Sequence, residues 1–166
     1  PYCLVTFHPE TNAFEKNKNY SIEMLKALEF ASTKINLVIT MPNADNLGKY
    51  YRKQLNLLSK KMRNKILLIE NFGKENYFSA MKSSKFLLGN TSSGIIEAAS
   101  FRKFVINLGK RQEGRLRNAN VFDVNFNKNK IMNCVKRIEE NPVYNGSNKY
   151  FKTDTAKNII DKLIHV

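Results

Sequence analysis

The sequence predicts an α/β domain built on a mostly parallel sheet with helices on both faces. Short apolar runs alternate with amphipathic helical patterns along the whole length, which is typical of repeated strand and helix units. The chain has 166 residues, of which 42% are hydrophobic, and this is enough to bury a core. Without an internal repeat or a low-complexity linker, we expect a single domain over residues 1–166.

The expected strands occupy residues 3–7, 36–41, 65–69, 86–88, 104–108 and 121–124. The expected helices occupy residues 20–34, 46–62, 75–82, a stretch that begins at residue 91 or 92, then 128–140 and 153–164. Pro9 ends the first strand, and the turn at residues 71–73 precedes the third helix. The first helix is expected to place Ile22, Leu25, Leu28 and Phe30 on its buried side.

The chain is strongly basic, with 28 Lys and Arg against 14 Asp and Glu and a formal charge of +14. Such a charge suggests an acidic partner, such as a nucleic acid, an anionic membrane face or a phosphorylated small molecule. The basic residues are scattered, however, and many lie on helix faces rich in Lys and Asn. No recognition helix, aromatic RNA-binding strand or basic tail is evident. We therefore expect a small phosphorylated partner, and neither a nucleic acid nor a membrane.

The cysteines, the histidines and the hydropathy pattern narrow the class of protein further. Cys3 and Cys134 both lie in apolar patterns and are expected to be core residues, not a disulfide. His8 and His165 are the only histidines, so a metal site is not expected. No run approaches the ~20 apolar residues of a membrane span, and no signal peptide opens the chain. These features predict a cytoplasmic protein.

Residues 85–115 contain the pattern of an anion-binding turn. A buried strand leads into Gly89 and Asn90, and a helix then begins among Thr91, Ser92 and Ser93, which are good N-cap residues. A helix N-terminus presents unpaired N–H groups and partial positive charge. Gly94 would let a ligand approach the backbone, and Arg111 and Arg115 follow the next strand at the same end of a parallel sheet. An ordinary capped β-α unit with solvated arginines remains the alternative.

Further polar and aromatic residues follow the other strands. Ligands of open α/β sheets bind beyond the carboxyl ends of the strands, where His8, Asn43, Asp45 and Phe72 are expected. Each has an ordinary explanation by itself, because a histidine near a strand end is often structural and Asn and Asp are common in turns. Their convergence on one edge favours a binding site.

Four blocks of sequence together resemble one known family. They are HPE at residues 8–10, PNAD at 42–45, GNTSSG at 89–94 with Glu97 one turn later, and VINLGKRQEGR at 105–115. They resemble the C-terminal half of UDP-N-acetylglucosamine 2-epimerases, two-domain enzymes of the GT-B type that bind the nucleotide between their halves. The resemblance covers essentially the whole chain, and the last two blocks are most similar to the hydrolysing branch.

The resemblance implies a Rossmann-like sheet that forms the C-terminal, UDP-binding half of a GT-B fold. It also implies a parent enzyme that removes the C2 proton of UDP-N-acetylglucosamine, expels UDP to give a 2-acetamidoglucal, and adds water. Its products would be UDP and N-acetylmannosamine, or a related sugar, for sialic acid type and surface polysaccharide biosynthesis. No cofactor is implied, and the parent enzyme could be a homo-oligomer. Because the catalytic carboxylates belong to the N-terminal half, the isolated chain is expected to bind nucleotide without turnover.

Residue roles follow from the same resemblance. The implied diphosphate contacts are Thr91, Ser92, Ser93 and Gly94, with Arg111 beside them. Glu97 would accept hydrogen bonds from the ribose hydroxyls, since both oxygens of a carboxylate can accept. Phe72 and Tyr77 would frame the uracil, although both could equally be core residues. Asn43 and Asp45 would lie near the nucleotide, and His8 would stabilise the departing UDP or act as an acid.

Two alternatives remain at this stage. The donor-binding half of a GT-B glycosyltransferase would use the same sheet edge, although His8 and the RQEGR block at residues 111–115 argue against it. A basic nucleic-acid-binding module would bind with a steep dependence on salt and would ignore UDP. The sequence leaves open the N-acetylated sugar of the parent enzyme and the nucleotide base.

Overall fold

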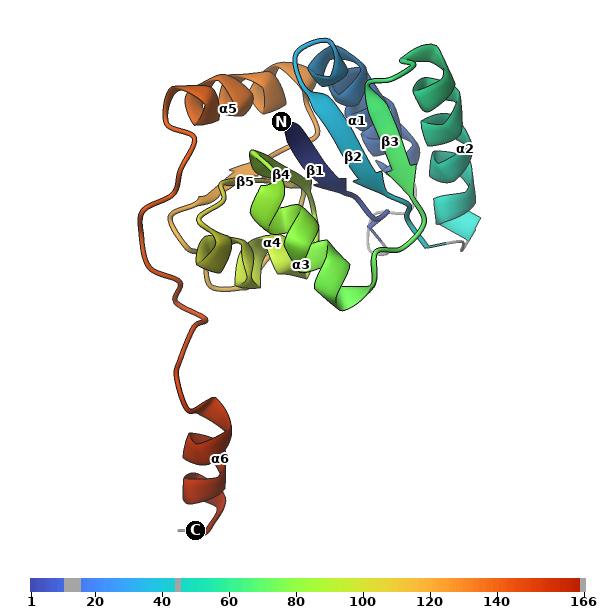
Figure 1. Ribbon diagram of the computed structural model, residues 1–166. Helices are drawn as coiled ribbons and strands as arrows, with labels where there is room; N and C mark the ends of the chain where they lie inside the picture. The colour runs from blue at the N-terminus through green and yellow to red at the C-terminus, as the bar shows by residue number, and fades with distance from the viewer. Residues whose placement is uncertain (11–15, 44–45, 165–166) are drawn as a thin grey trace.

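The computed structural model describes residues 1–10, 16–43 and 46–164, and its centre is a six-stranded sheet (Figure 1). The strands are β1 (Tyr2–Thr6), β2 (Asn36–Thr40), β3 (Ile66–Ile69), β4 (Phe86–Gly89), β5 (Val105–Leu108) and β6 (Val121–Val124). Their order across the sheet is β3-β2-β1-β4-β5-β6, and all neighbours pair in parallel. This is the doubly wound order, with its switch point between β1 and β4.

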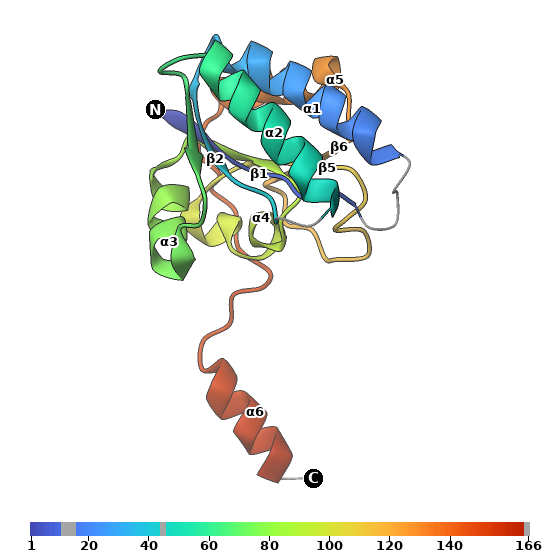
Figure 2. The same cartoon turned by 90° about the vertical axis from the view of Figure 1, so that its right-hand side faces the viewer.

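The helices are α1 (Asn17–Ser32), α2 (Asn46–Lys61), α3 (Gly73–Ser83), α4 (Ser92–Ile96), α5 (Lys128–Glu140) and α6 (Thr155–Ile164), with a 3-10 helix η2 (Ala98–Phe101) after α4. Helices α1, α2 and α5 cover one face of the sheet, and α3 and α4 lie on the other (Figures 1 and 2). The predicted Rossmann-like fold with helices on both faces is therefore confirmed.

The central strands read as continuous apolar runs because both of their faces are covered. In β1, Cys3 and Val5 pack beneath α1, α2 and α5, whereas Leu4 points to the side of α3. The same alternation places Leu88 in the first cluster and Leu87 in the second. Successive side chains of a strand point to opposite faces, so one short run supplies both halves of the core.

The buried side of α1 differs from the predicted one. Its buried residues are Asn17, Ser21, Met24, Ala27, Leu28, Ala31 and Ser32. Leu28 was assigned correctly, but Ile22 and Leu25 are only partly buried, and Phe30 is 40% exposed. Met24, Ala27, Leu28 and Ala31 form the apolar side that packs in the core, at the i, i+3, i+4, i+7 spacing of a helix face. Lys128 lies over the exposed ring of Phe30.

The helix that follows β4 begins at Ser92, as predicted, has only five residues and passes into η2. One further expectation needs correction. Cys3 is buried, but Cys134 is only partly buried, and both are free thiols. Burial raises the pKa of the Cys3 thiol well above its ordinary value.

Helix α6 stands apart from the domain in both views (Figures 1 and 2). Its apolar residues Ile159, Ile160, Leu163 and Ile164 are all more than half exposed. Among the helices that the structure describes, none is long and apolar enough to cross a bilayer.

Candidate functional site at the carboxyl edge of the sheet

The loops that follow the parallel strands meet along one edge, where the sequence predicts a site. His8 follows β1, Asn43 follows β2, and Phe72 and Tyr77 lie after β3. These four residues line one open cavity of about 320 Å³, together with Lys74 at the start of α3. Asp45 lies outside the described residues.

The turn after β4 is shaped by its own side chains. Thr91 has extended backbone angles and caps α4, and its Oγ1 accepts a hydrogen bond from the N–H of Gly94 at 3.2 Å. Ser92 and Ser93 form the first turn of the helix. Gly94 is buried, and a Cβ there would lie 3.0 Å from Cγ1 of Val105. The glycine therefore lets α4 pack closely on β5.

A chain of hydroxyl groups joins this turn to the cavity. The Tyr77 hydroxyl lies 2.9 Å from Oγ of Ser93, which lies 2.7 Å from Oγ1 of Thr91. On the other side, Oγ1 of Thr6 lies 3.4 Å from the Tyr77 hydroxyl and accepts a hydrogen bond from Thr40 at 2.8 Å. A phenol hydroxyl is a good donor, so Tyr77 can donate to Ser93. Because Ser93 and Thr91 share one hydrogen bond, one hydroxyl hydrogen of this pair then remains free to donate outward.

Asn90 braces the loops after β1 and β4 against each other. Its side-chain N–H donates to the carbonyl of His8, and its Oδ1 accepts from the N–H of His8, both at 2.8 Å. The preceding Gly89 has φ +145°, and a Cβ there would collide with the carbonyl of Thr6. Only glycine lets the backbone at residue 89 lie this close to β1. The backbone carbonyl of Asn90 accepts a hydrogen bond from Nη1 of Arg111 at 3.1 Å.

Glu97 places a carboxylate behind the turn. Its Oε2 is buried without a hydrogen-bond partner among the described residues. Burial raises the pKa of this carboxyl, and the backbone N–H of Glu97 and the positive charges of Arg115 and Lys74 oppose that rise. A buried carboxylate oxygen without a partner is costly, and hydroxyl groups of a ligand are suitable donors for it.

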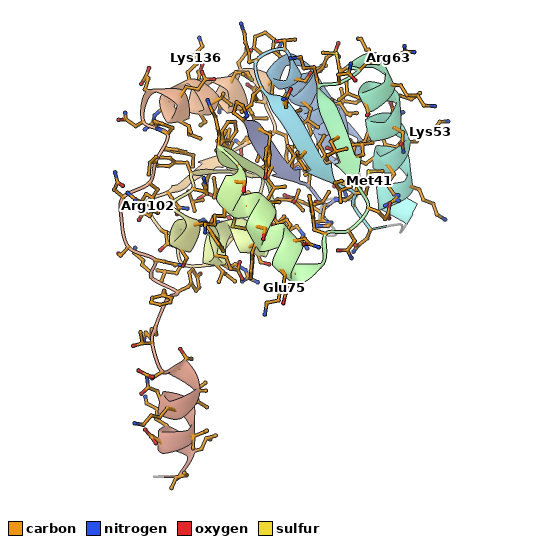
Figure 3. All side chains as sticks on the ribbon, viewed as in Figure 1. Met41, Lys53, Arg63, Glu75, Arg102 and Lys136 are labelled. Atoms are coloured by element: carbon orange, nitrogen blue, oxygen red, sulfur yellow. The ribbon has the colours of Figure 1, made fainter. Side chains whose placement is uncertain are left out.

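The basic residues do not form a single surface. Figure 3 shows Lys53 and Arg63 on the side of α2, Lys136 on α5 and Arg102 on the opposite side of the domain from α2. Arg111, by contrast, belongs to the edge that carries the turn, because its guanidinium reaches the carbonyl of Asn90. Among the described residues no group of three or more His, Cys, Asp or Glu could hold a metal ion.

The model of one protein family, described as UDP-N-acetylglucosamine 2-epimerase, matches residues 1–164. The chain belongs to this epimerase family. Its relatives in the family include the polysialic acid biosynthesis protein P7 of Escherichia coli, which is 31% identical over 163 residues covering 96% of the chain. The GDP/UDP-N,N'-diacetylbacillosamine 2-epimerase (hydrolyzing) of Campylobacter jejuni is 36% identical over 124 residues covering 75% of the chain.

Solved structures of the epimerase family have the same fold. The UDP-GlcNAc 2-epimerase of Neisseria meningitidis bound to UDP-GlcNAc superimposes with a TM-score of 0.77 at 22% identity, over 99% of this chain and 45% of that one. The matched parts of the Escherichia coli and Campylobacter jejuni proteins are 41% and 32% of their lengths. The chain thus spans less than half the length of these relatives.

Sequence reasoning missed several residues of this edge. Thr6 and Thr40 belong to apolar strands, β1 and β2, which lie side by side in the sheet. The only signal for them was that they lie near the carboxyl ends of these two strands. Lys74 sits in an ordinary helix start, and no sequence signal separates it from other exposed lysines. Asn90 was interpreted as a turn former, although its side chain reaches across to another loop.

Proposed function

We propose that this chain is the UDP-binding half of a hydrolysing UDP-sugar 2-epimerase. One observation supports the proposal most strongly. The residues to which the family resemblance gives a role, so far as the structure describes them, lie along one edge of the sheet. Within that edge, Tyr77 joins the cavity to Ser93 of the turn, and Glu97 keeps a buried oxygen that no described residue bonds. The phosphate oxygens of a nucleoside diphosphate could accept hydrogen bonds from the hydroxyls of the turn. Its ribose hydroxyls could donate to the buried oxygen of Glu97.

In this proposal the turn after β4 holds the diphosphate. Hydroxyl and N–H groups of Thr91, Ser92 and Ser93 donate to the phosphate oxygens, and Arg111 adds a charge-assisted contact. Glu97 accepts from the ribose hydroxyls. The base occupies the cavity beside Phe72, with Asn43 at its rim.

His8 stands where the loop after β1 meets the cavity, so we assign it to the sugar and phosphate side. Imidazole changes its charge near neutral pH and can supply a proton or a positive charge to departing UDP. The carboxylates for proton transfer at the sugar C2 would come from a further, N-terminal domain of the longer protein. In the whole enzyme the products would be UDP and N-acetylmannosamine, or a related 2-epimerised N-acetyl sugar.

Calorimetry with UDP, GDP and UDP-N-acetylglucosamine tests the binding proposal. We expect UDP and UDP-N-acetylglucosamine to bind with affinities that depend only weakly on salt. No binding of any of the three would contradict the proposal. Nucleic-acid binding that weakens steeply with salt, in a chain that ignores UDP, would instead favour a nucleic-acid-binding module.

An assay for N-acetylmannosamine tests the division of labour. The 166-residue chain alone should not convert UDP-N-acetylglucosamine, because it lacks the proposed carboxylates of the other domain. Robust turnover by the purified chain would mean that acid and base are both present here. The family match does not favour the donor-binding half of a glycosyltransferase, and product analysis of the longer protein separates the two.

A further inference from the structure

Glu10 is a buried carboxylate in a strongly basic chain, and the proposed function gives it no task. It follows β1 by a few residues and is only 7% exposed. Its Oε1 accepts hydrogen bonds from the N–H groups of Lys110 and Arg111, at 2.8 and 3.2 Å. These donors lie 100 and 101 residues away along the chain, in the loop after β5. Glu10 thus joins two loops of the candidate site directly.

Asn17 and Gly109 fix the position of Glu10. Asn17 at the start of α1 accepts from the Glu10 N–H at 2.8 Å and donates to the Glu10 carbonyl at 2.7 Å. On the opposite side Gly109 has φ +69°, and a Cβ at this position would collide with Oε1 of Glu10. A positive φ and close approach both call for glycine there. The backbone of Glu10 is therefore held by α1, and its carboxylate has room because residue 109 is a glycine.

The loop that Glu10 holds is fixed at a second point. Nη1 of Arg111 and Nε2 of Gln112 both donate to the carbonyl of Asn90, at 3.1 and 2.9 Å. The side chain of Asn90 in turn bonds both backbone groups of His8. Glu10 and Asn90 therefore fix the positions of His8 and Arg111 relative to each other, although these two residues follow different strands.

We propose that Glu10 is a positioning residue, which sets the backbone of Arg111 so that its guanidinium is ready for the diphosphate. The inference rests on the proposed function, because the task of Arg111 is to contact that ligand. An arginine side chain has several rotatable bonds, and a fixed backbone reduces the freedom it must lose when it binds. Glu10 itself does not touch the ligand and acts only through Arg111.

The test is a double-mutant cycle on UDP affinity in the full chain, measured by calorimetry. Glu10→Ala leaves two N–H groups without their acceptor and should weaken UDP binding by about tenfold. Glu10→Gln keeps an oxygen that can accept from both N–H groups, so it should stay within about threefold of the wild type. In an Arg111→Ala background, Glu10→Ala should cause little further loss, because the residue it positions is gone.

A merely structural role gives a different result. If Glu10 serves only the stability of the fold, Glu10→Ala weakens binding equally with and without Arg111, or leaves the affinity of the folded chain unchanged. Either outcome overturns the inference. Urea unfolding of each variant confirms that folded protein is compared.

Amide hydrogen exchange separates this inference from the proposed function. In Glu10→Ala, faster exchange is expected at Lys110 and Arg111 but not at His8, whose N–H is held by Asn90. If the wild-type chain does not bind UDP, the proposed function fails, yet exchange still reports whether Glu10 holds the loop. Unchanged exchange at both positions overturns the positioning role regardless of UDP.

Discussion

The two faces of the sheet are packed in different ways. Beneath α1, α2 and α5 lies a large apolar cluster of fully buried side chains, among them Leu28, Leu55 and Ile106. On the side of α3, α4 and η2, the fully buried cluster is small, and much of the packing comes from partly buried rings such as Phe72 and Tyr77. The second face is therefore the less tightly sealed of the two.

This difference explains where the site can form. On the second face, the short α4 and the aromatic rings of α3 leave a cavity at the edge of the sheet. The hydroxyls of Thr6, Thr40 and Tyr77 border this less sealed face. We therefore expect substitutions on the first face to change stability and substitutions on the second to change binding.

The largest effect is expected in the sealed core. Leu55 on α2 is fully buried, so Leu55→Ala should lower the free energy of unfolding by about 2–5 kcal/mol. Leu57→Ala on the same helix is the matched control, because Leu57 is 52% exposed and should change stability by no more than about 0.5 kcal/mol. Urea unfolding measures both, and similar losses would contradict the described burial.

The next effect separates the site from general basicity. Arg111→Ala removes a charge-assisted contact, so UDP affinity should fall by roughly 1.5–3 kcal/mol, or about ten- to a hundredfold. Replacing Lys60 and Lys61 together by Ala removes more charge from the far end of α2 and should cause only a small, salt-screened change. Calorimetry at physiological ionic strength compares them. Equal losses would mean that diffuse charge explains the binding.

A smaller effect tests the hydroxyl chain on the open face. Tyr77→Phe keeps the ring but removes its contact with Ser93, and should weaken UDP binding by about 0.5–1.5 kcal/mol. Uridine, which lacks phosphate, should bind the variant and the wild type equally. Tyr150→Phe is the matched control, since the Tyr150 hydroxyl donates to the carbonyl of Leu116. A loss for uridine as large as that for UDP would place Tyr77 against the base.

The smallest effect concerns the pH dependence of stability. The pKa of Glu97 in the native state is raised above its ordinary value of 4.5. At pH values between 4.5 and this raised pKa, the native state therefore binds more protons than the unfolded state. The contribution of Glu97 to stability therefore falls as pH rises through that window. Glu97→Gln should remove this part of the pH dependence in urea unfolding.

Ligand binding should depend on pH in the opposite sense. If Glu97 accepts from the ribose hydroxyls, UDP affinity should rise as its carboxyl ionises, and Glu97→Gln should flatten that profile. An identical profile in the variant would remove Glu97 from the nucleotide site. Calorimetry with UDP across the same pH range makes the measurement.

Much of this molecule was predictable because the relevant information is local. Alternating apolar runs predicted every strand near its observed position, and the parallel arrangement followed from the helices between them. Once the sheet is parallel, the residues after its strands must share an edge, so the cavity residues His8, Asn43 and Phe72 could be grouped from sequence alone. The blocks GNTSSG and VINLGKRQEGR predicted the family that the comparison confirms.

Only the tertiary structure decided how that edge is held together. Asn90 meets His8 across 82 residues, and Glu10 meets Lys110 across 100, so no local pattern reveals either contact. The structure also decided which side of α1 is buried and how closely Gly94 of α4 approaches Val105. Periodicity specifies which elements form, whereas the exact distance between elements, set by packing, specifies which polar groups meet.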